Sequence, residues 1–301
     1  MSAKTISIPI NSTFSFGECL WFLHRNYDDC MHSIADTKIM KAVLINEKPF
    51  LLQIYQKADS LEVEILSGVC NTEDSLAIKN YVIDWLDINR DLRPFYILLN
   101  QHRQLSYMVE EFKGLRMIGI PDLFEALCWS ITGQQINLTF AYKLKRRLVE
   151  KYGSKIEFEN QIFHLFPSFK ILAHADPADL KAMQFSGKKS EYIIGIAKLF
   201  DEGKLSKEML MSLPDMEARQ KMLMSVKGIG IWTANYALMK SLKEQSSIPY
   251  GDAGLVQALF LHNIITDKKD HLQILDFFKG MSGWESYIVF YLWRSLAKKL
   301  P

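Results

Sequence analysis

Short apolar runs separated by turn residues make up much of the first third of the chain, and this pattern predicts strands. Residues 61–66 are the clearest example, because Leu61, Val63 and Ile65 alternate with glutamates, as in a strand with one buried face. Similar runs lie at residues 41–46 and 50–55. The runs are too close together for helical crossovers, so they predict an antiparallel sheet. Two helices are expected to follow it, over residues 73–86 and 101–112.

From residue 121 onward, apolar residues recur at helical spacing instead. Leu123, Leu127 and Ile131 follow Pro121, and proline suits the first turn of a helix. Capping residues predict one further helix that ends at Gly153 and another that begins at Asp176. Apolar faces predict five more helices, over residues 187–202, 214–225, 231–242, 253–262 and 284–298. The pattern predicts an α+β protein, with a small antiparallel-sheet domain over residues 1–113 and an all-helical domain over residues 114–301.

The composition is that of an ordinary globular protein, since 49% of the 301 residues are hydrophobic and 23% are charged. It excludes a disordered chain, a collagen-like fibre and a miniprotein held by disulfides. No run of about 18 apolar residues occurs, so no membrane span is expected. The N-terminal residues lack the apolar core of a signal peptide, and we therefore expect a cytoplasmic protein.

The net charge and the cysteine content exclude only a few kinds of ligand or metal site. Lys and Arg total 36 and Asp and Glu total 34, so the formal net charge of +2 neither requires nor excludes nucleic acid. A polyanion would have to be bound by a local surface. The four cysteines, Cys19, Cys30, Cys70 and Cys128, are widely spread and form no C-x-x-C pair, which favours reduced thiols over a zinc site or an iron–sulfur cluster.

The stretch MLMSVKGIGIWTANYALMKS is the most specific in the chain. A predicted helix ends near Ser225 and another begins near Ile231, with Gly228 and Gly230 between them. Glycines let a backbone turn tightly and approach another molecule closely, and the amides of such a turn and of the next helix N-terminus form a site for a phosphate. Lys227 adds a positive charge. The alternative interpretation is a tight helix–helix turn without a ligand, because short motifs match by chance.

About twenty residues further on, the segment IPYGDAGL places an acid before another predicted helix. Asp252 on its own is explained as the N-cap of that helix. The pattern L-x-x-V-x-G-I-G-x-x-T-A, however, resembles the helix-hairpin-helix motif that grips DNA phosphates, and an acid at this distance after it is the arrangement of the glycine/proline-rich-loop DNA glycosylases. Residues 115–298 are similar to the glycosylase domain of AlkA-type DNA-3-methyladenine glycosylases. The N-terminal third resembles, more weakly, the small mixed domain that precedes it.

The resemblance implies a monofunctional enzyme that hydrolyses the N-glycosidic bond of alkylated purines in base-excision repair. Asp252 would stabilise the positive charge that develops on the sugar. Trp232 stands where bifunctional relatives have a Schiff-base lysine, as in the monofunctional AlkA pattern. Trp232, Tyr236 and Trp293 would form the pocket for the flipped base. The alternatives are a bifunctional 8-oxoguanine glycosylase/lyase and a non-catalytic DNA-binding module in which Asp252 is only a cap.

The same resemblance implies how DNA is held. The segment GQQI would fill the gap left by the flipped base, with Gln135 where AlkA has a leucine and Ile136 as the adjacent candidate. The DNA contacts would come from the hairpin turn, at Lys227, Gly228, Ile229, Gly230 and Thr233. Backbone carbonyls of the same turn would hold a Na⁺ or K⁺ ion, at Met224, Val226 and Ile229. No other cofactor is expected, and the partner would be double-stranded DNA with damaged bases, bound by a monomer.

Overall fold

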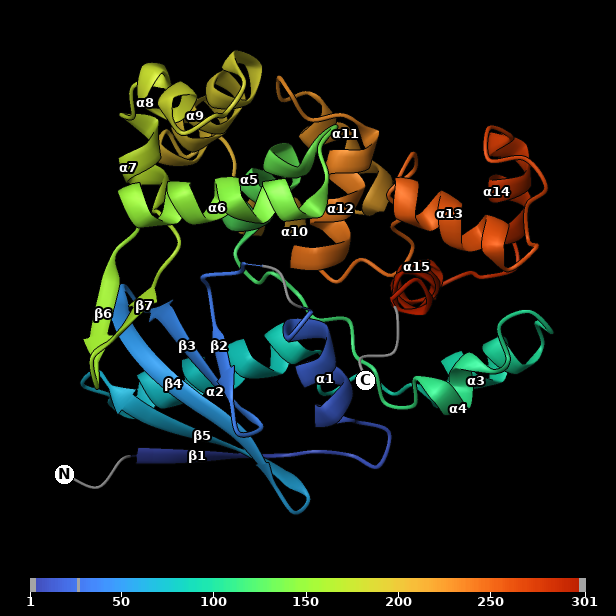
Figure 1. The fold of residues 1–301 in the computed structure, drawn as a ribbon, viewed down its shortest axis with the longest axis horizontal. Coiled ribbons are helices and arrows are strands. Elements are labelled where there is room, and N and C mark those ends of the chain that lie inside the picture. The colour runs from blue at the N-terminus through green and yellow to red at the C-terminus, as the bar shows by residue number, and fades with distance from the viewer. Residues whose placement is uncertain (1–3, 26–27, 298–301) are drawn as a thin grey trace.

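The computed structural model describes residues 4–25 and 28–297, and its N-terminal part is a five-stranded antiparallel sheet (Figure 1). The strands lie in the order β1-β5-β4-β3-β2. Their bounds are Lys4–Pro9 for β1, Ser33–Ala35 for β2, Lys38–Ile45 for β3, Lys48–Lys57 for β4 and Ser60–Ser67 for β5. The three predicted strands are confirmed as β3, β4 and β5. The pattern misses the two edge strands, because β2 has three residues and β1 alternates over only Ile6 and Ile8.

Local signals fix the register of the sheet and the start of the helix that covers it. Asn46 and Glu47 join β3 to β4 with φ of 49° and 61°, as in a hairpin turn whose twist matches that of the strands. Helix α2 (Thr72–Leu86) begins with a capping box between Asn71 and Asp74. Its apolar face packs into the same core as the sheet.

The predicted helix over residues 101–112 is wrong. The helix in this region is α3 (Arg93–Asn100), which has Pro94 in its first turn. Residues 101–107 form turns, and only the single-turn α4 (Met108–Glu111) follows. The physical reason is that Pro94 fixes the helix start earlier in the chain, so the apolar residues after Asn100 pack from turns instead of from a helix face.

The rest of the chain is helical apart from one hairpin, so the predicted fold class is confirmed. The helices not yet named are α1 (Phe16–Leu23), α5 (Leu123–Gly133), α6 (Leu138–Tyr152), α7 (Phe169–Ala173), α8 (Pro177–Ala182), α9 (Gly187–Asp201), α10 (Lys207–Met211), α11 (Met216–Met224), α12 (Ile231–Ser241), α13 (Ala253–Leu261), α14 (His271–Phe278) and α15 (Glu285–Ser295). Strands β6 (Lys155–Phe158) and β7 (Gln161–His164) form the hairpin. Four-residue strands carry too little periodicity to be recognised in a helical region. The last predicted helix ends at Lys298, which lies outside the described residues.

Two hydrophobic cores meet at α12. The first contains the apolar faces of the sheet and of α2 to α4 together with those of α13 to α15, so the N-terminal sheet and the last helices share one core. The second contains α5 to α12. Met239 of α12 belongs to the first core and Leu238 to the second. The domain boundary near residue 114 stays a prediction. Over the described ranges, no helix combines the length and the apolar character that a membrane crossing requires.

Candidate active site

The turn between α11 and α12 holds one glycine for an internal reason. Gly228 has a φ of +95°, which side-chain-bearing residues rarely adopt. A Cβ at this position would lie 2.3 Å from the ring of Tyr192 on α9. Gly228 is therefore required by the packing of the hairpin on α9, whatever the turn binds.

Gly230 differs from Gly228 in both respects. It is the N-cap of α12, with a φ of −91° that any residue can adopt and no side-chain hydrogen bond capping the helix. No atom lies within 4 Å of the place where its Cβ would stand. The open space lies at a helix N-terminus, where free N–H groups and the helix dipole favour an anion.

Gln134 braces the turn from the end of α5, and the sequence analysis did not single it out. Its Nε2 donates hydrogen bonds to the Gly228 carbonyl at 3.1 Å and to Thr233 Oγ1 at 2.9 Å. Thr233 is buried, so its hydroxyl faces this internal contact. Of the predicted DNA contacts, Thr233 and Ile229 have side chains that lie inside the protein. The only sequence signal for Gln134 was its place beside Gln135 in GQQI.

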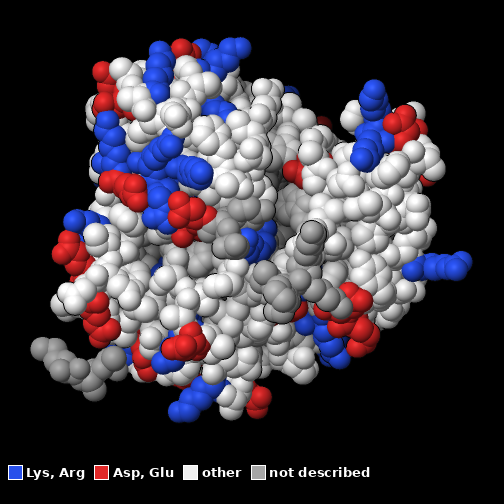
Figure 2. All heavy atoms as spheres, in the orientation of Figure 1, with Lys and Arg blue, Asp and Glu red and all other residues white. Residues whose placement is uncertain are grey.

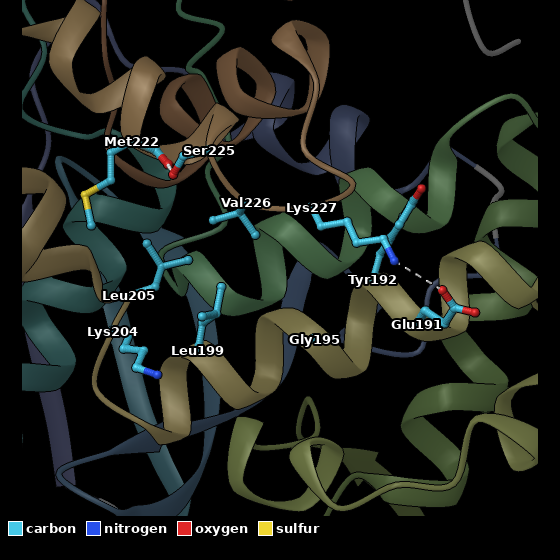
Figure 3. A pocket seen from close by; sticks show the side chains of 10 residues that line it. All are labelled: Glu191, Tyr192, Gly195, Leu199, Lys204, Leu205, Met222, Ser225, Val226 and Lys227. Atoms are coloured by element: carbon cyan, nitrogen blue, oxygen red, sulfur yellow. Dashed lines mark hydrogen bonds and ion pairs between the residues drawn. The ribbon is translucent and has the colours of Figure 1, made fainter.

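Lys227 lies at the tip of the turn and is highly exposed. Its Nζ is 3.6 Å from the Glu191 carboxylate, and Figure 3 shows it reaching across the surface beside Tyr192. A cavity of about 420 Å³ lies between α9 and the turn, and Figure 3 shows the side chains that line it. Val226 is one of them, but none of the residues around Asp252 is. For the predicted cation, the Val226 carbonyl accepts the Ile229 N–H at 3.1 Å, which leaves one lone pair of that oxygen for an ion. The cation site stays a prediction.

Asp252 is the N-cap of α13, as the bland interpretation of the sequence expects, but it also has two indole partners. Its Oδ1 accepts the Leu255 N–H at 2.7 Å and the Trp293 Nε1–H at 2.9 Å. Its Oδ2 accepts the Trp232 Nε1–H at 3.1 Å. Each carboxylate oxygen has two lone pairs, so both of those on Oδ1 are used and one on Oδ2 is left over. The half-buried carboxylate is held in one orientation with Oδ2 available to another molecule.

The three aromatic residues predicted to form a pocket come together around this carboxylate. Trp232 and Tyr236 stack on one face of α12 with their ring centres 5.5 Å apart. Trp293 comes from α15, and its ring centre lies 6.2 Å from that of Tyr236. A fourth aromatic residue was missed by the sequence analysis: Trp129 of α5, whose Nε1–H donates to the Tyr236 hydroxyl at 2.9 Å. Its signal was weak, because a tryptophan on a buried helix usually serves only packing.

The two predicted wedge residues, those expected to fill the gap left by the flipped base, differ in exposure. Gln135 lies at the tip of the connection between α5 and α6, is exposed, and has a φ of +56°. Ile136 is half-buried and packs against the core of the helical part. The Gln135 side chain is thus the one that is free to reach another molecule, although the wedge role itself stays a prediction.

The surface around the site has no single basic field. Figure 2 shows the molecule hollowed between the part built by α5 to α12 and the part built by α13 and α14, at the place where α12 meets the start of α13 in Figure 1. Lys and Arg side chains gather toward α6 to α9 and are interspersed with Asp and Glu. A polyanion in this hollow would meet backbone amides and individual side chains more than a strong overall potential.

Comparison with known protein families agrees with this arrangement of a glycine turn between two helices and an acid held beside aromatic rings. Residues 128–280 match the HhH-GPD family, described as "HhH-GPD superfamily base excision DNA repair protein", and residues 3–127 match the "8-oxoguanine DNA glycosylase, N-terminal domain" family. The chain belongs to the HhH-GPD superfamily of base excision DNA repair proteins. The resemblance drawn from the hairpin motif and Asp252 is confirmed.

Two relatives match the chain over different lengths. The chain is 38% identical to "DNA-3-methyladenine glycosylase" of Bacillus subtilis (strain 168), covering 97% of both chains. It is 32% identical to "DNA-3-methyladenine glycosylase 2" of Escherichia coli (strain K12), covering 60% of each. Among solved structures it is similar to the 3-methyladenine DNA glycosylase from Archaeoglobus fulgidus, with a TM-score of 0.84 and 19% identity over 98% of this chain and 100% of that one. This last likeness supports the fold.

The contrast between the two glycines gives a direct test of the turn. Gly230→Ala should lower the melting temperature only slightly, because alanine is a poorer N-cap than glycine, but it should weaken binding of duplex DNA by about tenfold, because the added methyl group stands where a phosphate would approach. Gly228→Ala should lower the melting temperature more, since a positive φ costs about 1–2 kcal/mol and the methyl group would clash with Tyr192.

The matched control is Gly195→Ala on α9, where a Cβ also meets no other atom. It should leave the duplex affinity unchanged and raise the melting temperature slightly, because alanine is the better helix former. Unchanged duplex affinity in a folded Gly230→Ala protein would exclude this turn as a DNA contact.

Proposed function

We propose that this protein is a monofunctional DNA glycosylase that flips alkylated purines of the 3-methyladenine type out of double-stranded DNA and hydrolyses their N-glycosidic bond. The observation that carries the proposal is the Asp252 carboxylate, held by the indole N–H groups of Trp232 and Trp293 at 3.1 and 2.9 Å. The names of the relatives from Bacillus subtilis and Escherichia coli supply the class of base.

Asp252 would act on the charge that appears as the base leaves. Cleavage of the glycosidic bond gives the sugar C1′ a positive character, and a carboxylate oxygen about 4 Å away stabilises it by about 4 kcal/mol at an effective dielectric of 20. That free energy corresponds to roughly a thousandfold in rate. Oδ2 is the oxygen with a lone pair to spare, so it would face the sugar or orient the attacking water.

Trp232 argues for hydrolysis rather than for a lyase reaction. By resemblance, bifunctional relatives have a lysine at this position, whose amine attacks the sugar and forms a Schiff base. Here the position two residues after Gly230 has an indole, and its N–H serves Asp252. The 8-oxoguanine glycosylase/lyase alternative agrees with the N-terminal domain, but this chain lacks the lysine nucleophile that a lyase reaction requires.

The remaining parts of the proposal concern how the DNA is handled. Trp232, Tyr236 and Trp293 offer aromatic faces, on which an electron-poor alkylated purine gains a cation–π contribution of about 0.5–2 kcal/mol. Gln135 would enter the gap in the duplex, supported by its exposure and its left-handed backbone at the loop tip. We further propose that the protein acts as a monomer in the cytoplasm and needs no cofactor beyond a structural Na⁺ or K⁺ ion at the carbonyls of Met224, Val226 and Ile229.

Methylated duplex DNA separates the alternatives. The wild-type protein should release free methylated purine without cutting the strand, and borohydride at neutral pH should trap no covalent protein–DNA complex, because no lysine stands at the position of Trp232. Efficient trapping together with strand cleavage would contradict the monofunctional mechanism, and DNA binding without base release would contradict catalysis altogether.

The two indoles should contribute unequally. Trp232→Phe removes the donor to Oδ2, whereas Trp293→Phe leaves Oδ1 still bonded to the Leu255 N–H. We therefore expect the single-turnover excision rate to fall by about tenfold in Trp232→Phe and by less in Trp293→Phe, since a hydrogen bond to a charged group contributes about 1.5–3 kcal/mol and part of it is regained from water. The reverse order would show that Oδ1 carries the chemistry. Both variants keep an aromatic ring, so each serves as the control for the other.

A further inference from the structure

The loop of residues 134–137, which we call the wedge loop, is hydrogen-bonded directly to the glycine turn. Gln134 is the C-cap of α5, with φ of −56° and ψ of 126°, and Gln135 follows it with a φ of +56°. The Gln134 Nε2 donates to the Gly228 carbonyl at 3.1 Å and to Thr233 Oγ1 at 2.9 Å. These partners lie 94 and 99 residues further along the chain. One side chain thus connects the residue before Gln135 with the turn and with the first turn of α12.

The two contacts determine which way the Gln134 amide points. The Gly228 carbonyl can only accept a hydrogen bond, so the NH₂ end of the amide must face it. An amide nitrogen has two hydrogens, and these two contacts use both of them. Gln134 is half-buried, so water competes only partly for the bonds. Among the hydrogen bonds of the described residues, these two are the ones that join the wedge loop to residues 226–233.

Helix α9 supports both of the parts that Gln134 connects. The Lys189 Nζ donates to the Thr132 carbonyl at the end of α5, at 2.8 Å. Three residues later, the ring of Tyr192 lies where a side chain at Gly228 would stand. Residues three apart share a helix face, so the end of α5 and the glycine turn rest on one side of α9. The Gln134 bonds therefore join two parts that α9 already holds close together.

Both ends of this linked unit are accessible to another molecule. Gln135 is exposed at the tip of the wedge loop. At the other end, the N-terminus of α12 is open at Gly230, with no atom within 4 Å of the place of a Cβ. Gln135 is the residue after Gln134, and Gly230 is two residues after Gly228. The side chain that would enter the duplex and the amides that would hold its phosphate are therefore joined by a short, hydrogen-bonded path.

We propose that Gln134 is a positioning residue that couples the phosphate contact at Gly230 to the insertion of Gln135 during base flipping. Flipping costs the pairing and stacking free energy of the base. A side chain in the gap offsets part of that cost only if it stands at the right place relative to the held backbone, because a misplacement of about 1 Å is enough to lose much of a rate. The inference rests on the proposed glycosylase function and on the wedge role proposed for Gln135.

The pairing of the target base separates coupling from simple stabilisation of the turn. A base opposite an abasic site has no pairing partner and costs less to flip, so its excision depends less on the wedge. If Gln134 only stabilised the turn, its loss would weaken DNA binding for paired and unpaired target bases alike. Coupling instead predicts a loss of excision rate that is larger where flipping is costly.

The experiment uses two duplexes with a single 7-methylguanine, opposite cytosine in one and opposite a tetrahydrofuran abasic analogue in the other. Excision is measured in single turnover with saturating protein, so that weaker binding does not enter the rate. Gln134→Leu keeps the approximate volume of the side chain and removes both hydrogen bonds. It should lower the ratio of the paired to the unpaired excision rate by about tenfold relative to wild type, as expected for the loss of two neutral hydrogen bonds.

Gln220→Leu is the matched control. Gln220 is another half-buried glutamine that braces α12, since its Nε2 donates to Asn235 Oδ1 at 2.6 Å, but it comes from α11 and not from the wedge loop. Its replacement should lower the melting temperature, as Gln134→Leu does, and leave the ratio unchanged. If Gln134→Leu does not fold, Thr233→Val removes one of the two acceptors with little change of shape and should lower the ratio by a smaller factor.

The wedge residue itself supplies a second test. Gln135→Ala should lower the ratio, and adding Gln134→Leu to it should lower the ratio no further, because no side chain is left to position. Effects that multiply independently in the double variant would overturn the coupling, as would an unchanged ratio in folded Gln134→Leu or Gln135→Ala, or an equal change in Gln220→Leu. Failure of the wild-type protein to release the base from either duplex would instead overturn the proposed function, so the two failures are distinguishable.

Discussion

The Asp252 carboxylate accepts hydrogen bonds from three separate parts of the chain, and the site exists only where those parts meet. Leu255 belongs to its own helix, Trp232 to α12 and Trp293 to α15. Helix α15 is packed in the core that includes the N-terminal sheet, whereas α12 contributes Ala234, Ala237 and Leu238 to the core of α5 to α12. The contact between the two hydrophobic cores therefore sets the orientation of the Asp252 carboxylate. In this orientation one lone pair of the carboxylate is left unused.

Different groups near the contact between the two cores suit different chemical parts of a ligand. Backbone amides at Gly230 suit phosphates, and the Asp252 carboxylate suits a developing positive charge. Each would face a different part of a nucleotide. This division explains how a chain with a formal net charge of only +2 can hold a polyanion, because contacts through amides do not require a strongly basic surface.

The sequence alone predicts those features of the site that depend on one segment of the chain. The glycines of the hairpin, the capping acid and the shared helix face of Trp232 and Tyr236 follow from spacing alone, while Trp293 required a family resemblance because it comes from a distant helix. Gln134 and Trp129 could not be anticipated, because helical periodicity tells which face a residue occupies and not what packs against that face. The wrong helix at residues 101–112 and the missed hairpin of β6 and β7 have a related cause, since tertiary contacts decide the conformation of short apolar runs.

The most direct test of this account compares the rate and the stability of Asp252→Asn. Asparagine remains a good N-cap and can accept from Leu255 and Trp293, but its NH₂ group cannot accept from Trp232 and it carries no charge. We predict a folded protein that still binds duplex DNA and whose single-turnover excision of methylated purine is slower by roughly a thousandfold. A folded Asp252→Asn protein that excises the base at nearly the wild-type rate would contradict the central role of this carboxylate.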